Sequence, residues 1–432
     1  MTRTLLAELD LAPSILVPSS PAASSPAASS PAAFSRNDES RVGRGHQPLF
    51  ASKVPIAAPW LPPKEEILKV LGPLLEGSQL TNGATVARLE REAARFLGVP
   101  DCVAVSSCTS GLMLVERCLG LTGEVILPSF TFFATGHSLL WNGLDPVLVD
   151  SDPGDLNMDP EQVERAITPR TTAILAVHVF GCPARVEALE EVARRRGLRL
   201  IFDGAHAFGS KVKGRGVAHW GDATVFSLSP TKPLVAGEGG LIAVGDPELA
   251  SQLRQARNYG KGATYDCDIL GLNARMTEMQ AALALLGLPY LAQNLRARND
   301  LAAIYGRYFK PTAGLTTQAI APGLSSTHKD FAVLVDPERF GICRNELEDA
   351  LTADNVEVRR YFDPPLHRQK FYQLCGPASA AGLAVAERLS SQVLCLPLHT
   401  GLKSETVEAI AARVVSMARP AARRASAPGH LL

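Results

Sequence analysis

Short apolar runs alternate with amphipathic segments through the first half of the chain. We predict strands at residues 102–105, 124–127, 146–149, 172–177 and 198–202. The segments between them have apolar positions at helical spacing, which predicts helices at residues 110–119, 131–141, 159–167 and 185–196. Strands separated by helices are typical of an α/β fold with a mostly parallel sheet covered on both faces. In such sheets, ligands bind beyond the carboxyl ends of the strands.

Two further helices, over residues 63–75 and 85–97, are predicted before the alternating region. After it, we expect a strand at Thr224 that stops at Pro230, a second apolar run at 241–244, a helix at 294–309 and a strand at 330–335. These elements predict a large domain with a sheet of the seven-stranded type, at residues 54–289, and a smaller C-terminal α+β domain, at residues 290–418.

The two ends of the chain differ in composition from this region. Ser-Ser-Pro-Ala-Ala occurs three times in succession at residues 19–33. Because such a segment cannot bury enough apolar surface to offset the entropy of ordering, we expect residues 1–53 to be a disordered extension, and residues 419–432 a disordered tail. Acidic residues among the arginines argue against a transit peptide.

Charge and cysteine usage narrow the class of function. The 43 basic residues balance 43 acidic ones, so no overall field attracts nucleic acid or an anionic membrane, and a small-molecule role is favoured. The eight cysteines are scattered, with neither a Cys-x-x-Cys pair nor clustering with histidines. We therefore expect no metal site, small buried thiols and a reducing, cytoplasmic location.

Two strand ends carry groups that suit a planar, phosphorylated ligand. Ser106 to Gly111 places hydroxyls at the start of a helix, where free N–H groups favour a phosphate. The alternative is that Thr109 or Ser110 only caps that helix. Phe132 follows the next strand and either stacks on a planar ligand or belongs to the core.

Two more strand ends carry charged groups. Asp203 ends a buried apolar strand, where a carboxylate needs a cationic partner unless it only caps the next segment. Lys232 lies between a strand end and the Gly-Glu-Gly-Gly turn at 237–240, a rigid edge that suits a reactive amine. Together, the phosphate cradle, the aromatic ring, the carboxylate and the amine are the groups that a pyridoxal phosphate site requires.

The chain from about Pro55 to Met417 resembles the DegT/DnrJ/EryC1/StrS aminotransferases, fold-type I enzymes that aminate keto-sugars. The motifs that carry the resemblance occur in order along the chain: Ser107-Cys-Thr-Ser-Gly111, Pro128-Ser-Phe-Thr-Phe-Phe-Ala-Thr135, Phe202-Asp-Gly-Ala-His-Ala-Phe-Gly209, Pro230-Thr-Lys-Pro233, Gly237-Glu-Gly-Gly240 and Gly271-Leu-Asn-Ala-Arg-Met276.

The resemblance implies roles for these residues around pyridoxal 5′-phosphate. Lys232 is expected to bond the aldehyde, Asp203 to pair with the pyridinium nitrogen and His206 to contact the 3′ oxygen. Phe132 is expected under the ring. The residues expected on the phosphate are Thr109, Ser110 and Ser227.

Partners and substrates are implied in the same way. Asn273 is expected to reach the phosphate in a neighbouring subunit, so the active form would be a homodimer with shared sites. Tyr361 and His367 lie in the segment near the sugar pocket of relatives. The implied reaction moves an amino group, from glutamate by family analogy, to a keto-sugar, usually nucleotide-linked, or to a keto-cyclitol.

Two departures from the family pattern qualify the resemblance. Cys108 stands where relatives usually have glycine or alanine, which narrows the phosphate cradle. The sequence from Pro233 to Ala236 differs from the one that is frequent beside the lysine in relatives, and we expect this segment to influence substrate choice. The alternatives are a sugar dehydratase of the same family or a non-catalytic regulatory or binding member. Lys232 argues against the first, and the presence of Lys232 and Asp203 together argues against the second.

Overall fold

The computed structural model describes residues 47–375 and 382–419, so the predictions made for residues 1–46 and 420–432 lie outside the described residues. The described residues belong to one compact unit. Phe50 N donates to Asp354 O at 3.3 Å, so this unit includes residues before the predicted start at residue 54. Within the described ranges, no helix is long and apolar enough to cross a membrane.

A seven-stranded sheet in the order β1-β9-β8-β5-β4-β2-β3 forms the centre of this unit. Its strands are β1 (Asp101–Val105), β2 (Glu124–Pro128), β3 (Asp145–Val149), β4 (Thr171–Val177), β5 (Arg199–Asp203), β8 (Ala223–Ser227) and β9 (Gly240–Val244). Strand β9 pairs antiparallel with β1 and β8, whereas β8, β5, β4, β2 and β3 pair in parallel. The predicted mostly parallel sheet of an α/β fold is confirmed, and six strands end at the same edge.

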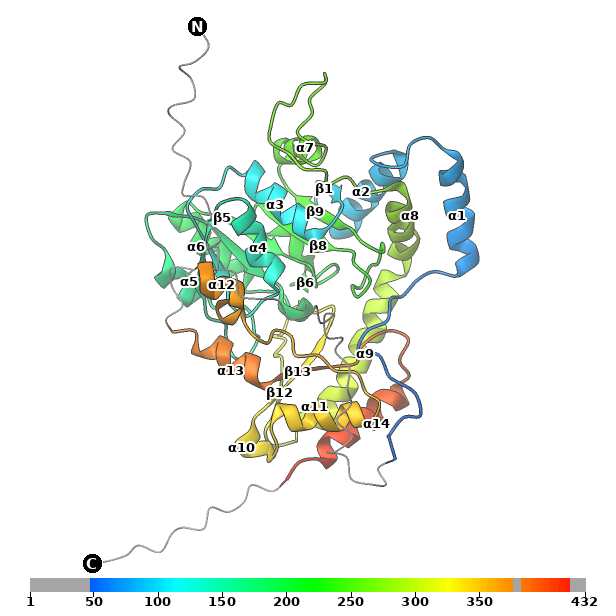
Figure 1. Cartoon of the computed structure of the whole chain (residues 1–432), viewed down its shortest axis with the longest axis vertical. Helices are drawn as coiled ribbons and strands as arrows, with labels where there is room; N and C mark the ends of the chain where they lie inside the picture. Colours follow the sequence, from blue (N-terminus) through cyan, green and yellow to red (C-terminus); the bar gives the residue numbers. More distant parts are fainter. Residues whose placement is uncertain (1–46, 376–381, 420–432) are drawn as a thin grey trace, which may run out of the picture. The chain divides into compact units, whose positions relative to one another are not determined.

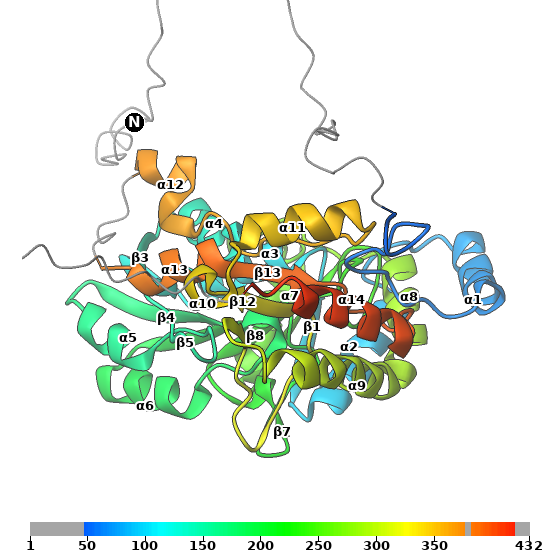
Figure 2. The same cartoon turned by 90° about the horizontal axis from the view of Figure 1, so that it is seen from below.

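Helices cover both faces of this sheet because alternate strand residues point to opposite sides. On β5, Leu200 and Phe202 belong to one buried cluster and Ile201 to another. Figure 2 shows α4 and α6 on opposite sides of β4 and β5. The helices of this part are α1 (Lys64–Glu76), α2 (Ala84–Leu97), α3 (Cys108–Cys118), α4 (Phe133–Trp141), α5 (Pro160–Ala166), α6 (Val186–Arg196), α7 (Pro247–Ala256) and α8 (Glu278–Gly287).

The C-terminal third has its own antiparallel sheet and buried cluster. The sheet has the order β10-β12-β13, with β10 at Leu315–Thr317, β12 at Phe331–Val335 and β13 at Val393–Leu396. The helices of this part are α9 (Leu291–Phe309), α10 (Pro337–Phe340), α11 (Arg344–Ala353), α12 (Lys370–Cys375), α13 (Ala384–Gln392) and α14 (Ser404–Ser416). A third short sheet joins β11 (Leu324–Ser325), β6 (Lys211–Val212) and β7 (Arg215–Gly216).

The helix α9 runs from the region of the large sheet to that of the small one (Figure 1). Its C-terminal half contributes Tyr305 and Phe309 to a buried cluster with Phe331 of β12, which is separate from the clusters of the large sheet. Each of the two larger sheets therefore has a buried cluster of its own, as the two predicted domains would require. The described residues belong to one compact unit, however, so the domain boundary at residue 289 stays a prediction.

The structure corrects several details of the predicted elements. Helix α9 begins at Leu291 rather than at residue 294, because a 3-10 turn at Leu288–Tyr290 leads directly into it. The strand expected to run to Pro230 ends at Ser227, where pairing with β9 ends. The expectation of buried thiols is wrong for Cys267, which is exposed in the loop after α7.

Candidate active site

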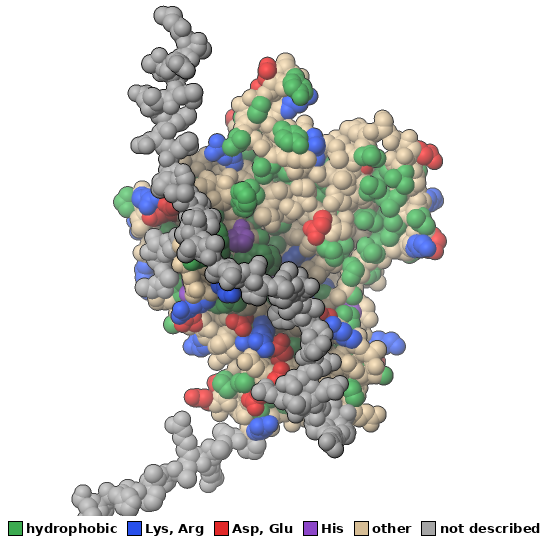
Figure 3. Space-filling model, viewed as in Figure 1, with side chains coloured by type: hydrophobic (Ala, Val, Ile, Leu, Met, Phe, Trp, Pro, Cys, Tyr) green, Lys and Arg blue, Asp and Glu red, His purple; other side chains and the backbone are tan. Residues whose placement is uncertain are grey.

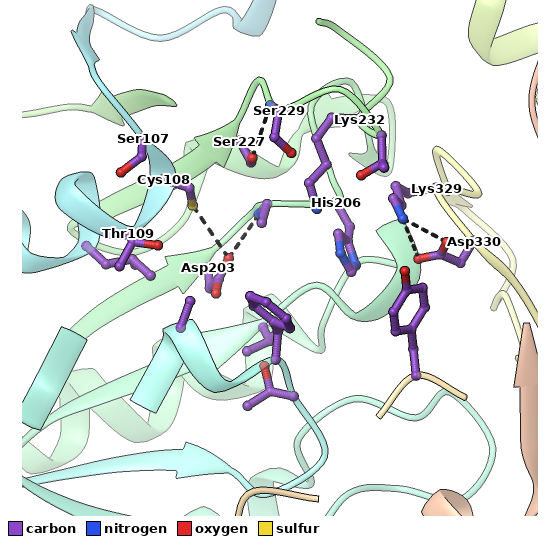
Figure 4. A pocket seen from close by; sticks show the side chains of 18 of the residues that line it. Ser107, Cys108, Thr109, Asp203, His206, Ser227, Ser229, Lys232, Lys329 and Asp330 are labelled. Atoms are coloured by element: carbon purple, nitrogen blue, oxygen red, sulfur yellow. Dashed lines mark hydrogen bonds and ion pairs between the residues drawn. The ribbon is translucent and has the colours of Figure 1, made fainter. Parts of the chain in front are cut away.

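A cavity of about 310 Å³ opens at the carboxyl edge of the large sheet. Polar side chains come to it from the ends of β1, β5 and β8, from the turn before β9, and from the segments that precede β12 and follow α11. Figure 4 draws side chains that line the cavity and labels ten of them. The predicted residues that line the cavity are Thr109, Phe132, Asp203, His206, Ser227, Lys232 and Tyr361.

Lys232 points into this cavity from the turn between β8 and β9 (Figure 4). The turn fixes its backbone, because Lys232 N donates to Ser229 O at 3.0 Å and Leu228 N donates to Gly239 O at 2.9 Å. The pKa of the Lys232 amine is lowered to about 8, mainly because the amine is buried and further because the Lys329 ammonium lies nearby. An amine with this pKa is partly neutral near physiological pH, which a nucleophile or base requires.

Asp203 is the buried carboxylate of the site. Its Oδ2 accepts from Thr135 Oγ1 at 2.8 Å, and its Oδ1 accepts from Ala205 N at 3.0 Å. Burial raises the pKa of Asp203, and these hydrogen bonds and the charge of Lys232 oppose that change. The bond to Ala205 is the local capping that a sequence reading allows, but the side chain also lines the cavity. A cationic or N–H-bearing ligand would therefore gain a strong partner here.

The N-terminus of α3 forms one end of the cavity. Ser107 caps this helix, because its Oγ accepts from Ser110 N at 3.0 Å while Ser107 N donates to Ser110 Oγ at 3.1 Å. Ser110 is thus engaged in the cap and does not line the cavity, whereas Cys108 and Thr109 do. The first amides of a helix have no partner within it, so they are free to bind an anion.

The glycine turn before β9 presses against this helix start. A Cβ at Gly240 would lie 2.7 Å from the backbone carbon of Ser107, so any side chain would push the turn away from α3. Gly237 and Gly239 have φ values of 84° and 149°, which only glycine adopts without strain. The three glycines of this turn therefore allow Lys232 and the N-terminus of α3 to lie at one cavity.

His206 and Phe132 add aromatic surface to the cavity. Phe180 N donates to His206 Nδ1 at 3.2 Å, so in the neutral ring the hydrogen is on Nε2. The pKa of His206 is lowered well below its usual value by burial and by the positive charges of Lys232 and Lys329. Phe132 is 44% exposed, so it is not a core residue. The centroid of its ring lies 3.9 Å from the centroid of the Phe133 ring.

Two other predicted residues do not line the cavity. Asn273 is exposed in the segment between α7 and α8. His367 is buried, and its Nδ1 lies 2.7 Å from Ser129 Oγ, so it fixes its own segment against the loop after β2. The roles implied for Asn273 and His367 stay predictions. Residues 233–236 are buried and do not line the cavity, and their influence on substrate choice stays a prediction.

Sequence reasoning gave no role to Glu238, which lines the cavity, and missed the charged pair Lys329 and Asp330. Both line the cavity directly before β12. In the sequence, Lys329 precedes the strand predicted at residues 330–335 and Asp330 begins it, a pattern that many surface strands also show. A possible signal was their order, since a Lys-Asp pair directly before a fully apolar strand places two charges at a buried edge.

Comparison with known proteins identifies the family to which this arrangement belongs. The profile of the DegT/DnrJ/EryC1/StrS aminotransferase family matches residues 63–415. The chain belongs to this family. It is therefore an aminotransferase, and the family resemblance seen in the sequence is confirmed.

Individual relatives agree over most of their length. The chain is 34% identical over 360 residues to a dTDP-4-amino-4,6-dideoxy-D-glucose transaminase of Shigella dysenteriae, which covers 83% of this chain and 97% of the relative. It is 36% identical over 363 residues to a UDP-N-acetyl-3-dehydro-α-D-glucosamine 3-aminotransferase of Acidithiobacillus ferrooxidans, covering 83% and 95%.

A solved structure shares the fold. The crystal structure of DesI in the presence of its TDP-sugar product superposes with a TM-score of 0.80 at 34% identity, covering 86% of this chain and 94% of that one. The α/β architecture described above is thus that of a sugar aminotransferase of known structure.

Proposed function

We propose that this aminotransferase uses pyridoxal 5′-phosphate to move an amino group from glutamate to the ketone of a nucleotide-linked sugar. The observation that carries the proposal is the enclosure of the Lys232 amine and the Asp203 carboxylate in one cavity, beside the N-terminus of α3. The nucleotide-sugar substrates in the names of two relatives support the acceptor class.

The residues of the cavity fit this cofactor. Asp203 offers a carboxylate for a pyridine N–H, and Phe132 offers a partly exposed ring. Thr109, Ser227 and the first amides of α3 offer donors for a phosphate. When bound, pyridoxal phosphate supplies an aldehyde that carries the amino group and a ring that withdraws electrons from the reacting carbon.

The residues of this chain supply orientation and proton transfer. Lys232 Nζ would accept a proton from the substrate carbon and return it, and such transfer contributes roughly 10²–10⁴-fold. Its pKa of about 8 leaves the amine neutral at mildly alkaline pH. Asp203, fixed by Thr135, would hold a proton on the ring nitrogen, and neutral His206 would direct its Nε2 hydrogen to an acceptor oxygen.

Two features support a homodimer as the active form. Helix α1 has no buried residue, and Leu68 and Leu75 on it are exposed. Figure 3 shows hydrophobic side chains gathered over the part of the surface where α1 and α8 lie. Exposed Asn273 is free to reach a partner's site.

We place this dimer in the cytoplasm, in keeping with the seven free cysteines of the described residues.

A cofactor-trapping experiment tests the lysine and the cofactor together. The purified protein is loaded with pyridoxal phosphate, reduced with borohydride and digested. We expect one labelled peptide, containing Lys232. Label spread over several surface lysines, or no visible-range absorbance after loading, would reject the cofactor assignment.

A reverse-direction screen tests the substrate class. The loaded protein is offered dTDP-4-amino-4,6-dideoxy-D-glucose, the 3-amino product of UDP-N-acetyl-3-dehydro-α-D-glucosamine, and glutamate in separate cuvettes. We expect the spectrum to change with glutamate and with at least one amino-sugar. A change with glutamate alone would reject nucleotide-linked sugars as acceptors.

A further inference from the structure

Lys329 and Asp330 form a buried ion pair on the wall of the cavity that faces the strand ends. Lys329 Nζ lies 2.8 and 3.0 Å from the two carboxylate oxygens of Asp330, and both side chains are only 4% exposed. In Figure 4, Lys232 lies between Ser227 and Ser229 on one side and this pair on the other. The pair and Lys232 line the same cavity, so a substrate bound there would lie against both.

The segment that carries the pair is held firmly. Arg298, buried on α9, donates to three successive carbonyls. Its Nε donates to Thr327 O at 3.3 Å and to His328 O at 3.1 Å. Its Nη2 donates to His328 O at 2.9 Å and to Lys329 O at 2.6 Å. Lys329 N donates to Phe180 O at 2.9 Å. These bonds fix the pair relative to both α9 and the large sheet.

Tyr361 completes this wall. Lys329 Nζ lies 5.4 Å from the centre of the Tyr361 ring, within the range of a cation–π contact. Tyr361 is half-buried and also lines the cavity. The ammonium is thus held between a carboxylate and an aromatic face, and both neighbours border the space in which a substrate would lie.

A buried ion pair is weak evidence for stability, because desolvation offsets most of the attraction between the charges. Placed on a cavity wall, it offers donors and acceptors side by side with little net charge. Sugar hydroxyls both donate and accept, so they match such a pair. An anionic carboxylate would meet the repulsion of Asp330 as well as the attraction of Lys329.

We propose that Lys329 and Asp330 recognise the acceptor, with Asp330 accepting from ring hydroxyls of the keto-sugar and Lys329 donating to them, and that Tyr361 shapes the same wall. This inference rests on the proposed function, because it assigns the subsite of the same acceptor. It makes the pair specificity-determining, and it separates acceptor binding from the Lys232 and Asp203 machinery.

One half-reaction and one binding measurement on the full-length protein loaded with pyridoxal phosphate test the pair. Asp330→Asn and Lys329→Met are compared with wild type for the rate of the spectral change with glutamate. Binding of dTDP-4-amino-4,6-dideoxy-D-glucose and of the 3-amino UDP-sugar is measured by calorimetry. We expect amino-sugar affinity to fall about tenfold or more in each variant, since a site built for hydroxyls loses paired groups. The glutamate rate, measured at a pH well above the Lys232 pKa of about 8 so that the amine is neutral in every variant, should change less than about threefold.

Asp354→Asn is the matched control. Asp354 is also buried and ion-paired, with Arg413 Nε at 2.6 Å, but it does not line the cavity. This variant should bind the amino-sugar as wild type does. Equal losses in Asp330→Asn and Asp354→Asn would show a structural effect only and overturn the inference.

The remaining outcomes are equally decisive. A slow glutamate half-reaction with unchanged amino-sugar affinity would assign the pair to the donor instead and overturn the inference. Wild-type affinity in both cavity variants would also overturn it, while leaving the proposed function intact. Failure of wild type itself to bind either amino-sugar would reject the proposed acceptor class, and the acceptor subsite with it.

Discussion

The two walls of the cavity are built in different ways. The strand-end wall carries Asp203, which is the last residue of β5, and Lys232, which lies in the turn after β8. The opposite wall carries Lys329 and Asp330, which precede β12, and its position depends on Arg298 of α9. The first wall is fixed by strand pairing and a glycine turn. The second is fixed by hydrogen bonds from Arg298 to carbonyls that lie 29 to 31 residues further along the chain.

This difference shows which functional residues can be found from the local sequence pattern. An apolar strand that ends in a charged residue indicates the carboxyl edge of a sheet, because backbone pairing on both sides of the strand fixes where that side chain points. The second wall has no such pattern, since a guanidinium that binds carbonyls can do so from any neighbouring helix. We therefore expect the first wall to carry the reaction and the second to carry its selectivity.

The largest effect should follow from Lys232→Ala. Because the variant removes the amine that moves the proton, turnover should fall by about 10²–10⁴-fold in both half-reactions, while the melting temperature stays near that of wild type. Stopped-flow spectroscopy measures the rates. Lys211→Ala, which changes an exposed lysine of β6, is the control. Appreciable transamination by the Lys232 variant would contradict the division between the two walls.

Asp203→Asn should have the next largest effect. The amide keeps the shape and can still bond Thr135 and Ala205, but it loses the charge that would hold a proton on the ring nitrogen. We expect turnover to fall by about 10²-fold, as when one preorganised electrostatic partner is lost. Asp222→Asn at the other end of β5, where Asp222 Oδ2 accepts from Leu200 N, should leave turnover unchanged. A rate near wild type in Asp203→Asn would remove this carboxylate from the reaction.

Arg298→Lys should act on the second wall alone. A lysine cannot bridge three carbonyls, so the unfolding free energy should fall by about 2–3 kcal/mol and the acceptor KM should rise about tenfold. Arg296→Lys, an exposed change on the same helix, is the control. Denaturant titration and steady-state kinetics measure the two effects. A lower rate with glutamate, at unchanged acceptor KM, would show that the two walls do not divide the work.

The smallest expected effect is a pair of opposite changes in the pKa of Lys232. Lys329 lowers this pKa and Asp330 raises it, beside smaller effects of Cys108 and Asp203. In Lys329→Met the pKa should rise, so the neutral amine appears only at higher pH, and in Asp330→Asn it should fall. Each midpoint should move by about one pH unit or less.

The measurement is the pH dependence of borohydride trapping of pyridoxal phosphate on Lys232 in the two variants. Ser325→Ala, an exposed change in β11 that alters no charge, should leave the midpoint in place. Movement of both midpoints in the same direction would mean that the pair does not act on Lys232 through its charges.

Much of the fold and part of the site could be predicted from local patterns. The alternation of strands and helices indicated the sheet, and Asp203 and Lys232 stood out because each interrupts an apolar context. Cap positions were less certain, because Ser107, Thr109 and Ser110 are all able to cap a helix, and only the backbone geometry chose Ser107. Residues 233–236 were expected to influence substrate choice, and this stays a prediction, because they are buried and do not line the cavity.

The sequence by itself determined the strand-end wall, because hydrophobic periodicity sets which residues end a strand, and Gly237, Gly239 and Gly240 allow the turn that presents Lys232. The tertiary structure decided that Lys329 and Asp330 face that lysine across one cavity. The physical reason is that their position results from Arg298 and Phe180, partners brought near only when α9 and β12 pack beside the large sheet.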